Sequence, residues 1–163
     1  MVNSKVLLDH HTSYEAAESI LWHRRIHGSG SGAPGSHENM PHFFLVGETK
    51  SQQAPPCKEE VILLFSTALP LQDCPDHRPR HGVVNKHLDA GYGVDFWQAT
   101  ITPGQEIRLI GMEILCGSPS RLLRKLIASR LGQPIQTHAN GGLYDPFSEL
   151  PGGFRQWAFE LAG

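Results

Sequence analysis

The first part of the chain changes from a short apolar run to an amphipathic pattern. Residues 5–9 (KVLLD) are mostly apolar, and the apolar residues of segment 16–21 then recur at the spacing of a helix that buries one face. Residues 12–15 (TSYE) have the form in which a hydroxyl caps an early backbone N–H group and a glutamate reaches back to the cap. This pattern predicts a strand followed by a helix of about three turns that ends near residues 24–25.

Strand patterns follow in the middle of the chain. Residues 41–46 (PHFFLV) predict a short aromatic strand, and residues 61–65 (VILLF) are continuously apolar, as in a strand that is buried on both faces. Residues 94–101 (VDFWQATI) alternate in character. A Thr-Pro-Gly-Gln turn at 102–105 then leads to a second apolar run at 107–115, so the two strands are predicted to form a hairpin.

The remaining segments predict a second helix, two loops and a final strand. Ser118 and Pro119 supply a helix cap and a proline suited to the first helical position. The buried stripe of this helix is predicted to consist of Leu122, Leu123, Leu126, Ile127 and Leu131. The polar or glycine-rich segments 28–35 and 70–87 are predicted to be loops, and residues 154–161 to be a strand.

Composition limits the classes of protein to consider. The chain has 163 residues, within the range of about 100–200 for one domain, so residues 1–163 are expected to form one core. Lys and Arg number 14 against 16 Asp and Glu, and the formal net charge of -2 disfavours binding of nucleic acid through bulk electrostatics. No apolar run approaches the ~18 residues that cross a bilayer, so no membrane partner is expected. Three cysteines without a CxxC pair, and an N-terminus without a long apolar stretch, predict reduced thiols and a cytoplasmic protein.

The segment Leu7 to Leu21 (LLDHHTSYEAAESIL) is the most informative one for function. Its strand end, its His-x-Thr-Ser sequence and its Ala-rich helix resemble the first motif of the ADP-ribosyltransferase superfamily. That motif usually reads His-Gly-Thr-Ser, and its histidine contacts a ribose hydroxyl of NAD. The resemblance gives His10 this role and makes Thr12 a brace of the loop, while His11 stands where the family has glycine. His10, His11 and Thr12 are therefore the expected cofactor-binding residues of this motif.

The family has two further motifs, each with a counterpart here. The second supplies an aromatic side chain that stacks on nicotinamide, which makes Phe43 the aligned choice and Phe44 its neighbouring alternative. The third supplies a hydrogen-bond acceptor, usually glutamate, that stabilises positive charge at the ribose. In this sequence the third position carries Gln98, and Asp95 is the nearby carboxylate, on the opposite face of a regular strand.

The resemblance implies an α+β fold with a split, mostly antiparallel β-sheet core, ADP-ribosyltransferase-like, and two main helices. It also implies that NAD is the substrate, and that ADP-ribose passes to an unknown acceptor (a protein, a nucleic acid or a small molecule) with release of nicotinamide. His10, with Gln98 or Asp95, would be catalytic. Because an amide brings no negative charge, the alternative is an inactive module of the same fold that binds NAD, another nucleotide or a partner. An effector or toxin of this kind would be delivered outside the cytoplasm of its origin.

Two metal-binding hypotheses compete with this interpretation. Asp9-His10-His11 resembles the motif of the DHH phosphoesterases, whose strand end supplies ligands for two-metal hydrolysis. That family needs further aspartates upstream, and only eight residues precede Asp9. The histidines of segment 77–87, together with Cys74, do not have the paired spacing of a common zinc module. The sequence therefore predicts no metal site.

Overall fold

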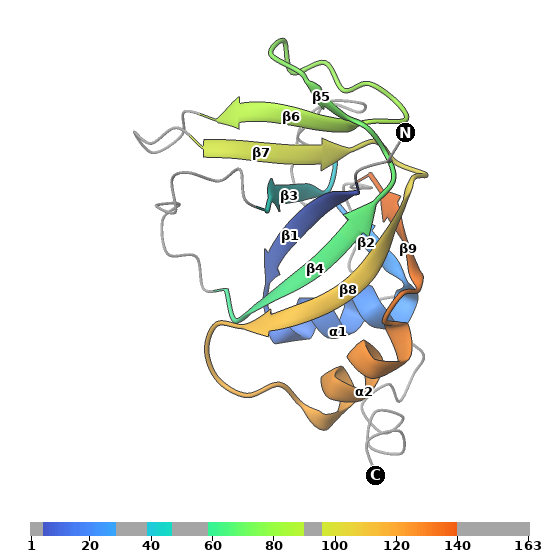
Figure 1. Ribbon diagram of the computed structural model, residues 1–163. Coiled ribbons are helices and arrows are strands. Elements are labelled where there is room, and N and C mark those ends of the chain that lie inside the picture. The colour runs from blue at the N-terminus through green and yellow to red at the C-terminus, as the bar shows by residue number, and fades with distance from the viewer. Residues whose placement is uncertain (1–4, 29–38, 47–58, 90–95, 140–163) are drawn as a thin grey trace.

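Two helices lie against one face of a large β-sheet (Figure 1). The computed structural model describes residues 5–28, 39–46, 59–89 and 96–139. Its elements in chain order are β1 (Val6–Thr12), α1 (Tyr14–His23), β2 (Arg25–His27), β3 (His42–Leu45), β4 (Val61–Thr67), β5 (Leu71–Asp73), β6 (Val84–Asp89), β7 (Phe96–Ile101), β8 (Glu106–Ile114), α2 (Arg121–Arg130) and β9 (Pro134–His138). In this described part of the chain, neither helix is long and apolar enough to cross a membrane.

The described strands form one hydrogen-bonded sheet in the order β2-β9-β8-β4-β1-β3-β7-β6-β5. The pairs β2–β9 and β5–β6 are parallel, and the other pairs in this sheet are antiparallel. The expected α+β class, with two helices and a mostly antiparallel sheet, is therefore confirmed. The described strands show no split, because β1 bonds to β3 on one side and to β4 on the other and so joins both halves.

The hydrophobic core lies between the sheet and the two helices. Strands β1 and β4 contribute Leu8 and Phe65, and the helices contribute Leu21 and Leu123; all four side chains are 0% exposed. Because side chains alternate along a strand, burial of Leu8 on the helix side turns Leu7, which is 43% exposed, to the other side. Strand β1 therefore divides its side chains between a packed face and a face that no described helix covers, the helix-free face.

Both helices begin at a serine, but one or two residues later than predicted. The Ser13 hydroxyl accepts a hydrogen bond from the Ala16 backbone N–H (3.1 Å), so Ser13 is the cap of α1. Thr12 cannot take this place because it is still paired with β4. Helix α2 is capped by Ser120 and not by Ser118. Both helices thus start where the chain first leaves extended pairing or a turn and a hydroxyl is available.

The predicted C-terminal end of α2 also needs one correction. The chain leaves helical geometry at Leu131, whose ψ is 128°, and Gly132 follows with a φ of 74°. Leu131 therefore turns away from the buried stripe and is 49% exposed. The rest of that stripe is buried or partly buried against the core, as predicted.

The predicted hairpin between residues 94–101 and 107–115 is wrong, although the turn between them is present. Gly104 has a φ of 86°, which glycine adopts at little cost. The turn is held by Thr137 of β9, whose carbonyl accepts from the Gly104 N–H (2.8 Å) and whose hydroxyl donates to the Thr102 carbonyl (3.0 Å). Strand β9 therefore pairs with β8, while β7 pairs with β3 and β6.

The prediction that residues 70–87 form a loop is also wrong in part. Strand β5 lies in this segment, and β6 begins in it and pairs with β7 over six residues. The polar composition was misleading, because Asn85 and His87 are buried at 0% and 2% exposure with their polar atoms hydrogen-bonded. Strands β2 and β9 were not predicted at all. The expected strand at 154–161, most of the expected loop at 28–35, and Asp95 lie outside the described residues.

The close approach of two chain segments at Gly28 gives a test of this fold. A Cβ atom at Gly28 would lie 2.0 Å from the Asn39 carbonyl oxygen, whereas one at Gly111 would lie 3.5 Å from the Leu64 Cδ1 atom, an ordinary contact. Gly28→Ala should therefore lower the free energy of unfolding by on the order of 2–3 kcal/mol. The matched Gly111→Ala variant should change it by less than about 1 kcal/mol. Urea denaturation measures both values, and equal stability of the two variants would contradict this packing.

Candidate functional site

Three segments far apart in the sequence lie on three neighbouring strands. Strand β3 pairs with β1 on one side and with β7 on the other. In the register of these pairs, Asp9 is opposite Phe44, and Phe44 is opposite Gln98. The first, second and third motif segments of the sequence therefore meet in one patch of the sheet. Because side chains alternate along each strand, the residues of this patch lie on opposite faces of the sheet.

His10 and Phe43 lie together on the packed face. Their ring centroids are 5.5 Å apart with an interplanar angle of 59°. Phe43 is only 2% exposed and meets Phe65 edge-on at 6.1 Å, so its ring belongs to the hydrophobic core. Phe43 is therefore not presented to a ligand, and the aromatic ring accessible from the helix-free face is that of Phe44, which is partly buried.

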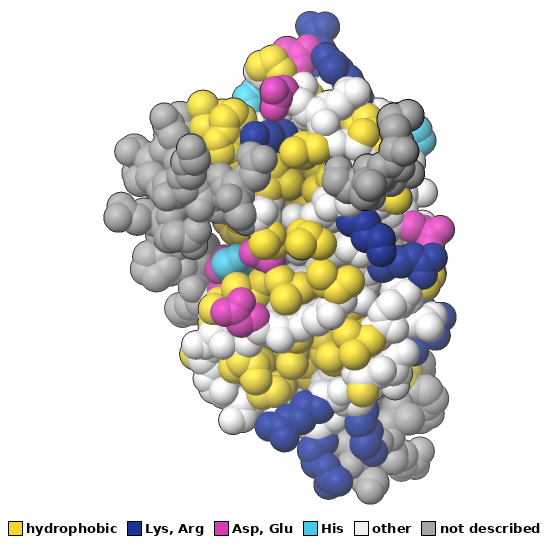
Figure 2. Space-filling model, in the orientation of Figure 1, with side chains coloured by type: hydrophobic (Ala, Val, Ile, Leu, Met, Phe, Trp, Pro, Cys, Tyr) yellow, Lys and Arg dark blue, Asp and Glu magenta, His cyan; other side chains and the backbone are white. Residues whose placement is uncertain are grey.

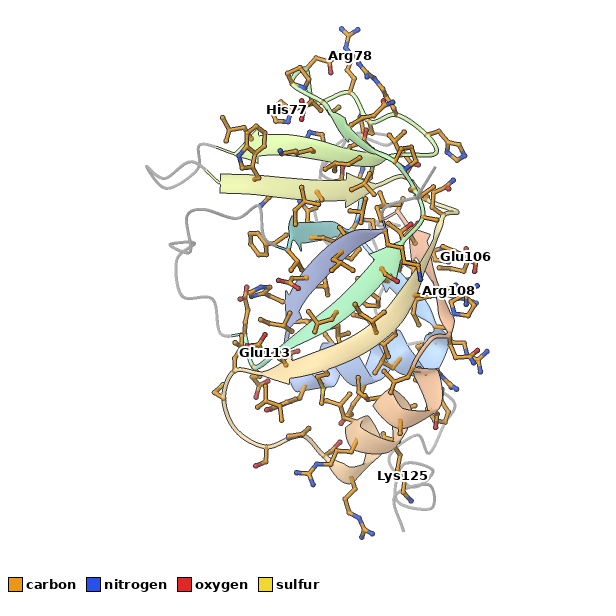
Figure 3. All side chains as sticks on the ribbon, in the orientation of Figure 1. His77, Arg78, Glu106, Arg108, Glu113 and Lys125 are labelled. Carbon is orange, nitrogen blue, oxygen red and sulfur yellow. The ribbon has the colours of Figure 1, made fainter. Side chains whose placement is uncertain are left out.

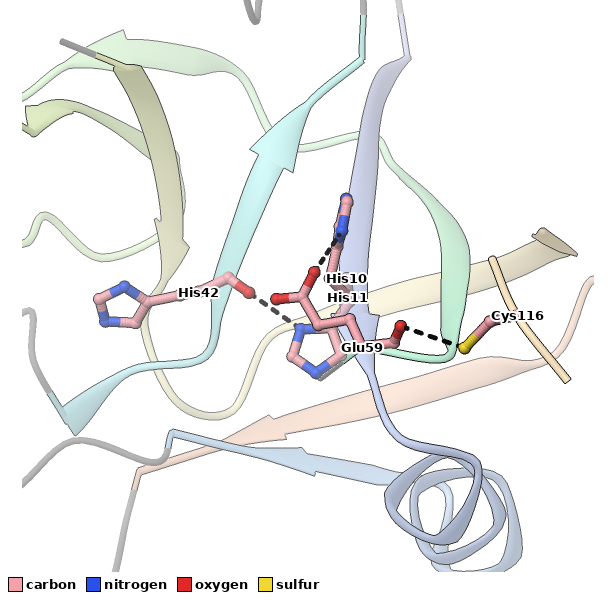
Figure 4. A network of polar contacts seen from close by, with 5 residues as sticks. All are labelled: His10, His11, His42, Glu59 and Cys116. Atoms are coloured by element: carbon pink, nitrogen blue, oxygen red, sulfur yellow. Dashed lines mark hydrogen bonds and ion pairs between the residues drawn. The ribbon is translucent and has the colours of Figure 1, made fainter. Parts of the chain in front are cut away.

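The hydrogen bond of His10 determines which of its nitrogens carries the proton. His10 Nδ1 lies 2.9 Å from the His42 carbonyl oxygen, and a carbonyl can only accept, so Nδ1 carries the hydrogen (Figure 4). Burial lowers the pKa of His10 to about 4, against the raising effect of that hydrogen bond. His10 is therefore neutral at pH 7, with Nδ1–H held by β3. It sits at the edge of the core and fixes β1 to β3.

Asp9, His11, Phe44, Glu59 and Gln98 form a polar and aromatic group on the helix-free face, which we name the open-face cluster. The His11 ring meets the Phe44 ring edge-on, with centroids 4.9 Å apart and an interplanar angle of 73°. The Gln98 Oε1 atom accepts a hydrogen bond from His42 Nδ1 (3.1 Å). Figure 2 shows this face, with hydrophobic side chains gathered across it and a histidine bordered by acidic side chains.

Glu59 is a member of this cluster that sequence reasoning missed. Its Oε2 atom accepts a hydrogen bond from His11 Nδ1 at 2.9 Å, and the two side chains are 30% and 24% exposed (Figure 4). Nothing in the spacing of residues 11 and 59 marks the pair, because the contact depends on the pairing of β1 with β4. The one available signal was that an acidic dipeptide directly precedes the buried run 61–65.

Asp9 has an unusual environment for a carboxylate. Its Oδ1 atom is buried and has no hydrogen-bond partner within the described residues. Desolvation raises the pKa of Asp9, the nearby His11 opposes this rise, and Glu113 adds to it. Asp9 therefore holds its proton to a higher pH than an exposed aspartate does.

The geometry argues against the Asp-His-His metal hypothesis. Alternation along β1 places Asp9 and His11 on the helix-free face and His10 on the packed face, so the three side chains do not converge. Across residues 5–28, 39–46, 59–89 and 96–139, no group of three or more His, Cys, Asp or Glu side chains is arranged to hold a metal ion.

The histidines near Cys74 make structural contacts. The His77 and His87 rings stack at 5.2 Å with an interplanar angle of 7°. His87 Nδ1 donates to the Cys74 carbonyl (3.2 Å), and its Nε2 accepts from the Thr100 hydroxyl (2.8 Å). Burial raises the pKa of the Cys74 thiol, which therefore stays protonated near neutral pH. These groups hold β5, β6 and β7 together.

The low pKa of His10 predicts an acid-sensitive fold. Between pH 6.5 and about 4, the unfolded chain binds a proton at His10 that the folded chain does not. The free energy of unfolding should therefore fall as the pH is lowered through this range, by on the order of 3 kcal/mol, with no further loss from this group below it. Asp9 acts in the opposite direction, because its raised pKa makes the folded state bind a proton first.

The test compares the wild-type protein with His10→Gln, whose amide can still donate to the His42 carbonyl but does not titrate. Urea denaturation from pH 7.5 to 4 should show a shallower fall for His10→Gln. Parallel curves for the two proteins would show that His10 titrates normally in the folded state.

Comparisons of this chain with protein-family models, with curated proteins and with solved structures find no match. The placement of the side chains described above is therefore the basis for assigning a function. That placement joins the three motif segments on β1, β3 and β7, and divides them between His10 and Phe43 on one face and the open-face cluster on the other.

Proposed function

We propose that this protein binds NAD on the helix-free face of β1, β3 and β7 and transfers ADP-ribose to an acceptor, with release of nicotinamide. The observation that carries the proposal is the cross-strand row Asp9–Phe44–Gln98, in which one aromatic ring is flanked by a carboxyl group and an amide. Neighbouring strands are about 4.8 Å apart, so the flanking side chains start about 10 Å from each other. A nicotinamide ring stacked on Phe44 would have a polar group on each side.

Each member of the row has a role that suits its chemistry. Phe44 offers a π-face for the nicotinamide ring. The amide of Gln98, whose oxygen is oriented by His42, can pair with the carboxamide of nicotinamide through its N–H groups. His11 and Asp9 lie beside Phe44 on β1 and would face the ribose. In this arrangement His11, and not His10, is the imidazole that reaches the cofactor.

His10 then acts as a positioning residue. It donates to the His42 carbonyl, and the His42 side chain donates to Gln98, so His10 is connected through β3 to the amide on the other face. Thr12 accepts at its backbone carbonyl from the Glu60 N–H (3.0 Å), and we propose that this residue braces the loop that follows β1. We further propose that the α+β fold is ADP-ribosyltransferase-like, and that the acceptor is a protein, a nucleic acid or a small molecule.

A second candidate function is binding of NAD without turnover. It is favoured by Gln98, because an amide brings no negative charge to a ribosyl cation. The two candidates share the same binding site and differ only in the release of nicotinamide.

Phe44→Ala tests the site that both candidates share. Removal of the ring should weaken NAD binding by about 1–3 kcal/mol, the usual contribution of an aromatic stacking partner. Isothermal titration calorimetry with NAD measures this change, and an assay of nicotinamide release separates transfer from binding. Ile110→Ala, which truncates an apolar side chain of β8 that is 46% exposed, is the matched control and should bind NAD as the wild type does.

The outcomes of this experiment are distinct. Binding with release of nicotinamide supports transfer, and binding without release supports the inactive module. No heat of NAD binding to the wild-type protein, or equal affinity of Phe44→Ala and the wild type, would rule out the site on Phe44.

A further inference from the structure

We propose that His11 and Glu59 form a general-base pair that removes the proton from a hydroxyl acceptor during transfer, with water as the simplest such acceptor. This inference rests on the proposed NAD site and adds to it the acceptor class and the group that activates the acceptor. It is carried by the direct contact of His11 with Glu59, by the hydrogen-bonded backbone around that contact, and by its position beside the Asp9–Phe44–Gln98 row.

The contact with Glu59 determines which nitrogen of His11 carries the hydrogen. A carboxylate only accepts hydrogen bonds, so the Nδ1 atom, 2.9 Å from Glu59 Oε2, carries a hydrogen. In the neutral ring Nε2 is then the nitrogen that can accept a proton. An imidazole whose Nδ1–H is held by a carboxylate is an arrangement that enzymes use to activate hydroxyl nucleophiles, because the carboxylate orients the ring and stabilises the imidazolium that forms.

The backbone holds this pair in place. Glu60, next to Glu59, donates from its N–H to the Thr12 carbonyl (3.0 Å), and its carbonyl accepts from the Leu115 N–H (2.9 Å). The Glu60 side chain also accepts from the Tyr14 N–H (3.2 Å) at the start of α1. The approach to β4 is therefore tied to β1, to α1 and to the end of β8, which fixes the position from which Glu59 reaches His11. Groups on such a frame keep catalytic geometry better than groups on a free loop.

Several titratable side chains surround His11. Carboxyl groups face it from β1 (Asp9) and from the segment before β4 (Glu59), with Glu113 of β8 acting on Asp9; Glu113 is labelled in Figure 3. His10 lies on the other face of β1, and burial lowers its pKa to about 4, so it is neutral near pH 7. The edge-on contact with Phe44 restricts the rotation of the His11 ring.

The chemistry of NAD requires one base and no acid. When the bond between the anomeric carbon and the nicotinamide nitrogen breaks, its electron pair passes to the positively charged ring, and nicotinamide leaves as a neutral molecule. The acceptor oxygen forms the new bond to the anomeric carbon, and its proton passes to His11 Nε2 and later to solvent. With water as acceptor, the products are ADP-ribose, nicotinamide and one proton. The open-face cluster supplies the single base that this reaction needs.

The experiment measures nicotinamide release from NAD in water as a function of pH. His11→Gln should lower kcat by about 10²-fold or more and should remove the rise of kcat with pH that a single base produces. Glu59→Gln should lower kcat less, since the amide oxygen can still accept from His11 Nδ1 and only the negative charge beside the base is lost. Glu106→Gln, which removes an exposed carboxylate at the opposite end of β8 from Glu113, is the matched control and should keep the wild-type pH profile.

A second readout does not depend on activity. NMR of the His11 ring nitrogens should show a hydrogen-bonded Nδ1–H in the wild type that is lost in Glu59→Ala, because the Glu59 carboxylate is its acceptor. Wild-type kcat and an unchanged pH profile in His11→Gln, with NAD still bound, would overturn the base and leave the proposed NAD site intact. A wild-type protein that does not bind NAD would instead overturn the proposed function, and the base pair with it.

Discussion

The pairing of β1 on both of its edges is the constraint on which the rest of the structure depends. Because β3 and β4 both bond to it, β1 cannot rotate about its axis without breaking two ladders of hydrogen bonds. The burial of Leu8 at 0% exposure then fixes the side on which every other residue of the strand lies. A shift of one residue would place Asp9 in the hydrophobic core, where an unpaired carboxylate is costly.

This constraint gives two adjacent histidines different chemistry. His10 faces the core, donates to a backbone carbonyl and has a pKa lowered to about 4. His11 faces away from the helices and is 24% exposed, with a carboxylate as its partner. Both residues are histidines, so their different roles follow only from the alternation of side chains along β1. The His-x-Thr-Ser resemblance makes His10 the cofactor ligand. In the register described here, His10 instead hydrogen-bonds to the backbone of β3.

The sequence predicted the elements that local patterns determine and missed those that depend on distant pairing. Helix α1 and strands β3 and β4 follow from periodicity and apolar runs, which are properties of consecutive residues. The false hairpin arose because adjacent strands usually pair, whereas Thr137, far along the chain, bonds to the turn and directs β9 onto β8. Strand β6 was missed because its buried polar residues are satisfied by side-chain hydrogen bonds that a sequence does not display.

The candidate site shows the same limit. Residues 9–11, 43–44 and 98 were singled out from the sequence and do lie on neighbouring strands, but their division between two faces required the register. Glu59 was beyond prediction, since its contact with His11 joins residues that only the β1–β4 ladder brings together.

The identity of residue 98 bears on where negative charge can act in this site. Phe44 is opposite both Asp9 and Gln98, so a positive charge that develops above its ring is about equally far from β1 and from β7. Electrostatic stabilisation depends on that distance and on the local dielectric, and not on which strand carries the carboxylate. Desolvation raises the pKa of Asp9, because the buried carboxylate is stabilised less than an exposed one. Glu59, which is 30% exposed and hydrogen-bonded to His11, places a second carboxyl group on the β1 side of the row, whereas Gln98 on the β7 side is an amide.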